Sequence, residues 1–183
     1  MDVLDTIRKC FAVTGLLPYA GEAVTQAEHA LQCAQSAEAY GASDTLITAA
    51  LLHDIGHMID KDDERLALNG VDARHESQGA DFLQMSFPLA VSEPVRLHVT
   101  AKAYLCAIDP QYYGGLSFVS RRSLELQGGT LLEAEVDAFR NQPFAEDAVL
   151  LRRWDDLAKE VGRETQPLEY FLAIVAKTLV AQA

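Results

Sequence analysis

The sequence predicts an all-α protein that forms one domain over residues 1–183, and three observations support this. Apolar residues recur every three to four positions through most of the chain, as on the buried face of an amphipathic helix. Capping residues and glycines stand at the ends of these stretches. No stretch alternates apolar and polar residues as a half-buried strand does. A hydrophobic content of 49% over 183 residues suffices for a substantial core.

The first half of the chain divides into helices at its capping residues. Helices are expected over residues 2–14, 22–40, 44–54 and 75–85. Gly15 and Gly41 end the first two. Ser43 is a suitable N-cap for the third. Residues 17–21 and the charged stretch 60–74 are expected to be loops.

The second half is also helical. Ser92 is expected to cap a helix that has Pro94 in its first turn and ends near Cys106. Residues 109–115, rich in proline, glycine and tyrosine, are expected to form a loop. Gly128 and Gly129 end the helix that follows. The remaining helices are expected over residues 117–126, 131–140, 145–161 and 168–181.

Composition excludes several classes of function. A net charge of -12 leaves no excess of Lys and Arg, so a basic surface for nucleic acid is not expected. The three cysteines form no CxxC pair and no signal peptide is recognisable, which favours the cytoplasm. No apolar run approaches the roughly 20 residues that span a bilayer, so no membrane association is expected.

Histidine and aspartate residues indicate a buried metal site. His53 and Asp54 follow an apolar run, which places an imidazole and a carboxylate in the core. Burying such groups unpaired costs roughly several kcal/mol, so a metal ion is the favoured partner. A lone buried histidine is more often a satisfied core residue, but here histidines and aspartates recur on separate apolar helices. Imidazole with carboxylate suits iron, manganese, zinc or nickel, and a carboxylate beside a histidine can bridge two ions.

The order His29…His53-Asp54…His75…His98…Asp155 resembles the HD-domain superfamily, with the extra histidines of its dinuclear members. Most of that superfamily are phosphohydrolases. Two further segments resemble a smaller branch, the mixed-valent diiron oxygenases related to inositol oxygenase that cleave organophosphonates: Tyr19-Ala20-Gly21-Glu22 and Leu124-Glu125-Leu126-Gln127-Gly128-Gly129. The resemblance covers residues from about 17 to 160 and implies a single HD-domain helical bundle with its metal site built from residues 19–155.

This resemblance implies two iron ions in the Fe2+/Fe3+ state, with O2 as co-substrate. One iron would be bound by His29, His53, Asp54 and Asp155. Asp54 would bridge to a second iron, bound by His75 and His98. Tyr19 would be a reversible ligand of that second iron, displaced by substrate. Glu22 would pair with Tyr19 at rest and afterwards meet the cationic group of the substrate.

Two residues follow metal ligands by four positions and so share their helix faces. Lys102 follows His98, and we expect it to bind phosphonate oxygens; a solvated helix lysine is the alternative. His57 follows His53, and we expect it to contact the phosphonate or to act as an acid or base. The alternative for His57 is a histidine at a helix end, near water.

Further residues match family positions near the substrate. Ser120, Gln127 and Arg152 correspond to positions around the phosphonate, although by sequence alone Ser120 and Arg152 are ordinary helix-surface residues. Ala20 is small, which would leave room beside a bulky substituted ammonium group.

The function that the resemblance implies is oxidative cleavage of the C–P bond of a 1-hydroxyphosphonate in organophosphonate catabolism. The expected substrates are 1-hydroxy-2-aminoethylphosphonate, giving phosphate and glycine, and its N-trimethyl analogue, giving phosphate and glycine betaine. A companion hydroxylase could supply either through solution. One alternative is a phosphohydrolase acting on a phosphate ester or nucleotide, which needs the same ligands but neither Tyr19 nor Glu22. The other is a degenerate HD domain that senses a ligand or binds a partner; the intact ligand set argues against it.

Overall fold

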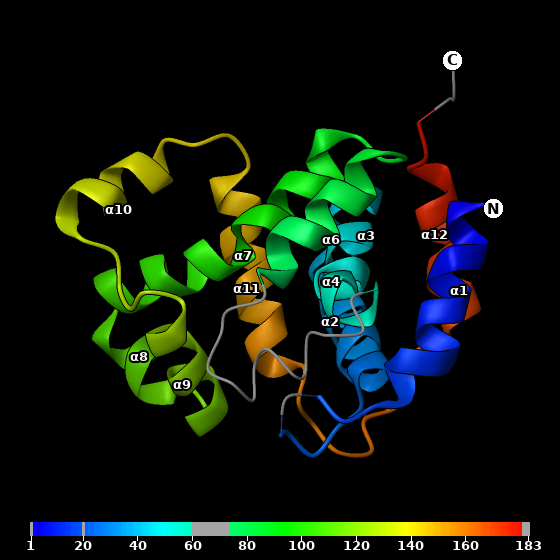
Figure 1. Ribbon diagram of the computed structural model, residues 1–183, viewed down its shortest axis with the longest axis horizontal. Coiled ribbons are helices and arrows are strands. Elements are labelled where there is room, and N and C mark those ends of the chain that lie inside the picture. The colour runs from blue at the N-terminus through cyan, green and yellow to red at the C-terminus, as the bar shows by residue number, and fades with distance from the viewer. Residues whose placement is uncertain (1, 20, 60–73, 181–183) are drawn as a thin grey trace.

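The computed structural model describes residues 2–19, 21–59 and 74–180, and over these residues it consists of helices and connecting loops (Figure 1). The only strand-like pairing in this part of the chain is an isolated antiparallel bridge between Pro18 and Thr25. The all-α prediction is confirmed. Among the described residues, none of the helices combines the length and the apolar character that crossing a bilayer requires.

The N-terminal helices begin and end at local signals. Helix α1 (Val3–Val13) continues into a 3-10 turn, η1 (Thr14–Leu16). Helix α2 (Gln26–Tyr40) begins four residues later than the predicted residue 22, because Thr25 and Glu28 form a capping box there. Gly41, with a φ of 82°, ends α2 as predicted.

Helix α3 (Asp44–Leu52) is capped by Ser43, whose hydroxyl accepts from the backbone N–H of Leu46. The prediction of one helix through residue 54 was wrong at its end. The chain turns at His53 and Asp54 and then forms the short helix α4 (Ile55–Ile59). Most of the predicted loop 60–74 lies outside the described residues.

The prediction that Ser92 caps a helix was wrong. Helix α7 (Leu89–Ile108) begins after Pro88, and Pro94 lies inside it. Ser92 is fully buried, and its hydroxyl has no partner among the described residues. Residues 109–115 are not a loop either, because Asp109 accepts from the backbone N–H groups of Gln111 and Tyr112 and so caps a short helix, α8 (Pro110–Gly115).

The other helices lie close to their predicted positions. They are α6 (His75–Gln84), α9 (Phe118–Leu126), α10 (Glu133–Arg140), α11 (Ala145–Leu157) and α12 (Leu168–Lys177). The last two end four residues before their predicted C-terminal boundaries.

Helix α7 is the central element of the fold. It packs against α3, α6 and α11, and in Figure 1 it runs from the middle of the molecule toward α8, α9 and α10. Helices α1 and α12 lie together at the opposite end, where Arg8 hydrogen-bonds Glu169. The main core gathers apolar side chains of α1, α2, α3, α4, α6, α7, α11 and α12. Helices α2, α3, α6, α7 and α11 therefore enclose the centre of the molecule.

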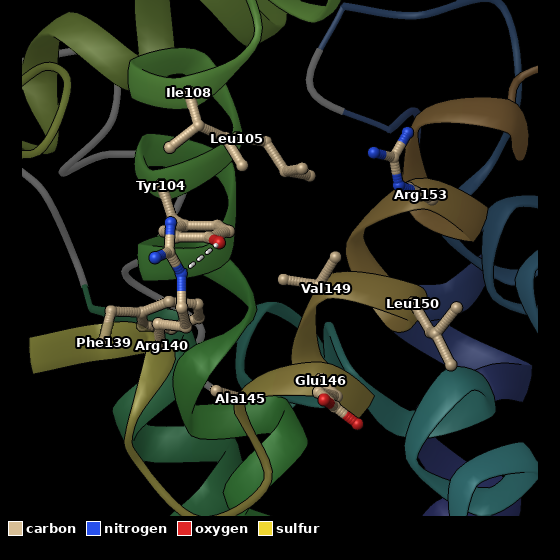
Figure 2. Close-up of a pocket in the computed structure, with 10 residues that line it drawn as sticks. All are labelled: Tyr104, Leu105, Ile108, Phe139, Arg140, Ala145, Glu146, Val149, Leu150 and Arg153. Atoms are coloured by element: carbon tan, nitrogen blue, oxygen red, sulfur yellow. Dashed lines mark hydrogen bonds between the residues drawn. The ribbon is translucent and has the colours of Figure 1, made fainter. Parts of the chain in front are cut away.

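A pocket of about 510 Å³ lies between α7, α10 and α11 (Figure 2). Tyr104, Phe139 and Val149 line its apolar part, and the Nε of Arg140 donates to the Tyr104 hydroxyl over 3.4 Å. None of the predicted site residues lines this pocket.

Candidate metal centre

The imidazole rings of His29 and His53 face each other through their Nε2 atoms. The Nδ1 of His29 lies 2.8 Å from the carbonyl oxygen of Ala158, and the Nδ1 of His53 lies 2.9 Å from that of Ala50. A carbonyl only accepts, so each Nδ1 carries a proton, and a ring that holds this proton alone presents a bare Nε2 to a metal ion. The two Nε2 atoms are 3.1 Å apart in a site closed to solvent. Such a pair needs a cation between or beside its members.

A second histidine pair lies next to the first. The Nε2 atoms of His75, at the start of α6, and His98, inside α7, are 3.3 Å apart. The Nδ1 of His98 lies 2.7 Å from the carbonyl oxygen of Val95, which again leaves the Nε2 bare. The Nδ1 of His75 lies 3.7 Å from a carboxylate oxygen of Glu76.

Asp54 stands between the two pairs and presents one oxygen to each. Its Oδ2 lies 3.6 Å from the Nε2 of His29 and 3.3 Å from that of His53. Its Oδ1 lies 3.4 Å from the Nε2 of His75 and 3.6 Å from that of His98. Burial opposes ionisation of this carboxyl, but in the absence of metal ions the charge of a protonated His53 holds its pKa well below the usual range, and Asp54 in turn raises the pKa of His53 despite its burial. The turn between α3 and α4 therefore places a carboxylate where it can bridge two ions.

Asp155, on α11, completes the first group. Its Oδ1 lies 3.4 Å from the Nε2 of His29, and its Oδ2 forms a 2.6 Å ion pair with Arg152. Burial alone would favour the neutral acid, but the Arg152 guanidinium holds the pKa of Asp155 well below its usual range. Arg152 is itself buried and also contacts Asp156 and the Tyr112 hydroxyl. These contacts place Arg152 behind a metal ligand; its expected contact with a phosphonate stays a prediction.

The residues present fit two metal ions. Asp54 Oδ2 and Asp155 Oδ1 are buried oxygens without a hydrogen-bond donor among the described residues. His29, His53 and Asp54 form one group of potential ligand atoms within 4.8 Å of one another, and Asp54, His75 and His98 form another. Buried polar atoms that lack a protein partner are expected where an ion belongs. Nitrogen and carboxylate oxygen donors without thiolate are typical of iron, manganese and zinc sites.

The side chain of Tyr19 covers this centre. Its ring stacks on His29 with 3.8 Å between ring centroids and 13° between planes. Burial, together with the charges of Asp155 and Asp54, raises the pKa of the Tyr19 hydroxyl well above its usual value. The phenol is therefore neutral at physiological pH in the absence of metal ions. A cation near Asp54 and Asp155 would reverse the sign of the local charge and favour the phenolate.

The side chain of Glu22 contacts Ser117 and Lys159, whereas its predicted pairing with Tyr19 is seen only in the backbone, where the Glu22 N–H donates to the Tyr19 carbonyl. Its Oε1 accepts from the Ser117 hydroxyl over 2.8 Å and lies 3.4 Å from the Nζ of Lys159. The same Nζ donates to the Ser120 hydroxyl over 2.9 Å and lies 6.0 Å from the centre of the Tyr19 ring. Glu22, Ser117, Ser120 and Lys159 thus form one polar cluster beside Tyr19, which we call the Glu22 cluster.

Lys102 is buried, and its side chain points toward α9. Its Nζ donates to the Ser123 hydroxyl over 2.7 Å and to Oε1 of Gln127 over 2.6 Å. Burial, assisted by the charge of Arg152, lowers the pKa of Lys102 to about 7. A buried ammonium group held by neutral partners is suited to a doubly charged phosphonate. Lys102 and Gln127, both predicted from the sequence, are therefore brought together.

His57 and Gly56 bring α4 against the start of α6. The His57 ring stacks on the His75 ring with 3.9 Å between centroids. A Cβ at Gly56 would stand 2.1 Å from the carbonyl oxygen of His75, so only glycine permits this approach. Gly79 of α6 faces the same contact from the other side. The structure thus places His57 next to a candidate ligand. The predicted Ala20 lies outside the described residues.

Sequence reasoning missed Lys159, Ser117 and Ser123. Lys159 follows Asp155 by four positions, the spacing that singled out Lys102 after His98, but it stands beyond the end of α11. Its contact with Glu22 joins segments that are distant in sequence, which no helical periodicity reveals. Ser117 and Ser123 are hydroxyl residues of a kind common at helix ends and surfaces, so only the fold distinguishes them.

The chain is similar to several known proteins. A family model described as "HD domain" matches residues 27–160. A hydroxymethylphosphonate dioxygenase of Gimesia maris is 50% identical over 151 residues, which cover 82% of this chain and 75% of that protein. A [1-hydroxy-2-(trimethylamino)ethyl]phosphonate dioxygenase (glycine-betaine-forming) of Leisingera caerulea is 38% identical over 182 residues, covering 96% and 90%. An uncharacterized protein of Acanthamoeba polyphaga mimivirus is 32% identical over 178 residues, covering 96% and 81%.

Proposed function

Because the chain belongs to the HD-domain family and, within it, to the phosphonate dioxygenases, we propose that it uses O2 to cleave the C–P bond of a 1-hydroxyphosphonate at the centre formed around Asp54. The observation that carries this proposal is the position of Asp54, with one oxygen toward His29 and His53 and the other toward His75 and His98. This arrangement suits two ions that share one carboxylate.

We propose that both ions are iron, in the mixed Fe2+/Fe3+ state. His29, His53, Asp54 and Asp155 would hold one. Asp54, His75 and His98 would hold the other, with Tyr19 as a ligand that substrate displaces. When bound, two iron ions supply the electron transfer to O2 that no amino-acid side chain provides.

The chemistry balances with O2 as the only oxidant. A 1-hydroxyphosphonate and O2 give a carboxylic acid and phosphate. The C1–H, C–P and O–O bonds break, one oxygen atom of O2 is bonded to C1 and the other to phosphorus, the C1 hydrogen ends on oxygen, and four electrons pass from C1 to O2. The chain's own residues then have to hold the phosphonate, orient C1 and exclude water until substrate is bound.

The phosphonate would be held at the α7–α9 side of the site. Lys102 supplies a buried ammonium group, and Gln127 and Ser120 supply polar atoms on the same side. His57, beside His75, would donate to a phosphonate oxygen or hold a proton there. Arg152 would hold Asp155 in its ionised form, in addition to its predicted contact with the phosphonate.

The substituent on C1 distinguishes three candidate substrates. Two are 1-hydroxy-2-aminoethylphosphonate and its N-trimethyl analogue, which carry a cation. The third, named for the Gimesia maris relative, is hydroxymethylphosphonate, which carries none. A companion hydroxylase that oxidises C1 of the parent phosphonate would supply any of the three through solution.

The first experiment measures phosphate release from the three candidates by iron-loaded protein, with and without O2. We expect release only with O2, with one equivalent of carboxylic acid for each phosphate. A p-nitrophenyl phosphate ester under anaerobic conditions is the control for the phosphohydrolase alternative. Anaerobic hydrolysis of that ester, with no release from any phosphonate, would place the chain with the hydrolases.

A Tyr19→Phe substitution tests the covering role of the phenol. The stacking on His29 is kept while the hydroxyl is lost, and the other proposed iron ligands stay in place, so both iron ions should still bind. We expect O2 to be consumed without substrate several times faster than in the unaltered enzyme, and less phosphate to form per O2. Tyr113→Phe, on the exposed surface of α8, is the matched control. Equal O2 consumption and equal coupling in all three proteins would contradict a role for Tyr19 in oxygen chemistry.

A further inference from the structure

We propose that Lys159 sets the substrate preference of this enzyme: by pairing with Glu22 it favours a 1-hydroxyphosphonate without a cationic substituent. This inference rests on the proposed function and concerns the same site. Glu22 is the residue that the family resemblance assigns to the substrate's cation. In this structure the Glu22 carboxylate already has a cation of its own.

The contacts of Glu22 already compensate much of its negative charge, so Glu22 attracts a cationic substrate only weakly. Its Oε1 accepts from Ser117 over 2.8 Å and lies 3.4 Å from the ammonium group of Lys159. The side chains of Lys159 and Glu22 are only 15% and 18% exposed, so water screens the pair weakly. A substrate ammonium group that reached Glu22 would also come within reach of Lys159. Like charges so placed repel, and an uncharged substituent avoids this repulsion.

Lys159 is fixed in place by its neighbours in the chain. The carbonyl oxygen of Ala158 is bonded to the Nδ1 of His29, and the backbone of Glu160 exchanges two hydrogen bonds with the side chain of Gln32, at 2.8 and 3.1 Å. Both partners belong to α2. The backbone on each side of Lys159 is therefore anchored to the helix that carries a candidate metal ligand, and the ammonium group is not that of a freely moving surface lysine.

The Nζ of Lys159 also bonds to the Ser120 hydroxyl over 2.9 Å, so α9 holds it from the far side. It lies 6.0 Å from the centre of the Tyr19 ring. A group that displaced Tyr19 would enter the space next to Lys159. The ammonium group of Lys159 thus lies where we expect the substituent on C1 of the substrate to bind.

The test compares kcat/KM for hydroxymethylphosphonate and 1-hydroxy-2-aminoethylphosphonate in the iron-loaded enzyme and in Lys159→Met. We expect the unaltered enzyme to prefer the uncharged substrate. In Lys159→Met the ratio of cationic to uncharged kcat/KM should rise at least about tenfold, because Glu22 loses its partner. Glu22→Gln combined with Lys159→Met should remove this gain. Calorimetric titration of each substrate under anaerobic conditions should show the same change in affinity.

Two control variants separate charge from structure. Lys159→Arg keeps the charge and should keep the preference. Lys177→Met removes an exposed lysine that pairs with Asp44 far from the Glu22 cluster, and should change nothing. An equal loss for both substrates in Lys159→Met, or an unaltered enzyme that prefers the cationic substrate, would overturn the role of Lys159. Failure of the unaltered enzyme to release phosphate from any phosphonate with O2 would overturn the proposed function instead.

Discussion

At the scale of single residues, backbone carbonyls decide which nitrogen of each imidazole is available. Ala158, Ala50 and Val95 present their carbonyl oxygens to the Nδ1 atoms of His29, His53 and His98. Each contact fixes both the tautomer and the rotation of the ring, as hydrogen bonds behind metal ligands generally do. The support comes from backbone atoms, so it does not depend on the side chains of Ala158, Ala50 and Val95.

Lys102 gives the site a dependence on pH. Burial, assisted by Arg152, lowers its pKa to about 7, so in the free enzyme the ammonium group is present below that pH and is lost above it. We expect kcat/KM for a phosphonate to fall as the pH rises through about 7, because this parameter reports ionisations of the free enzyme. A pH profile of kcat/KM at saturating O2 measures this.

The Lys102→Met variant tests whether Lys102 causes this fall of kcat/KM above pH 7. It keeps the length and the apolar stem of the side chain but removes the charge. At pH 6 it should lower kcat/KM roughly 10- to 100-fold, the loss expected for a charge-assisted hydrogen bond. The fall above pH 7 should disappear in the variant. If it persisted unchanged, the titrating group would be elsewhere.

At the scale of elements, the contact between α4 and α6 positions a candidate metal ligand. Gly56 lets α4 approach the backbone of His75, and Gly79 lies so close to Gly56 that a Cβ added at Gly79 would stand 3.2 Å from the Gly56 nitrogen. His75 is the first residue of α6, so any shift of that helix relative to α4 moves its imidazole. Two small residues therefore set the distance between the two histidine pairs.

A Gly56→Ala substitution should displace His75. The added Cβ would stand 2.1 Å from a backbone oxygen, so the helices have to separate. We expect the variant to bind about half as much iron as the unaltered protein, with the ion at His29 and His53 kept, and to lose phosphate release. Metal analysis of the purified protein checks this. Gly114→Ala, where a Cβ meets nothing within 4 Å, is the control; full iron binding in Gly56→Ala would contradict the role of the contact.

Local signals explain what the sequence predicted well. Ser43 and Gly41 mark helix ends through hydrogen bonds or dihedral angles within a few residues of each, and both predictions were confirmed. Ser92 has the chemistry of a cap but faces the core, which is a tertiary fact. The break of α3 before His53 was missed because the apolar pattern continues through it.

The residues of the candidate site also divide into those that the local sequence predicts and those that only the fold brings together. Its histidines and aspartates could be predicted because imidazole and carboxylate groups in apolar helices are unusual wherever the helices lie. The structure brings six of them together: His29, His53, Asp54, His75, His98 and Asp155. The pairing of Glu22 with Lys159 depends on the position of a loop against the end of α11, and no local pattern specifies it.

At the scale of the whole molecule, the candidate ligands join elements far apart in sequence. They come from α2, the α3–α4 turn, α6, α7 and α11. Without ions, the close imidazole nitrogens and two buried carboxylate oxygens without donors, Asp54 Oδ2 and Asp155 Oδ1, oppose this packing. With ions bound, the same groups hold five elements together. Metal binding should therefore contribute to folding stability.

Removal of metal should lower the melting temperature by about 10–20 °C, if each of two ions is present at about 100 times its Kd. Scanning calorimetry of the iron-loaded protein, before and after dialysis against a chelator, measures the shift. Asp54→Asn, which weakens both ion sites, should show a smaller shift on chelation. A melting temperature that chelation leaves unchanged would mean that these groups do not hold ions.

Backbone hydrogen bonds connect Tyr19 with the residues that precede α2. The N–H of Tyr19 donates to the carbonyl of Val24 over 2.9 Å, that of Glu22 donates to Tyr19 over 2.7 Å, and that of Gln26 donates to Leu17 over 3.0 Å. These bonds tie Tyr19 and Glu22 to each other and to the start of α2. A displacement of Tyr19 from His29 would therefore also be felt by the backbone of Glu22, whose carboxylate contacts Lys159. The cover of the metal centre and the charge balance beside it are linked through this short segment.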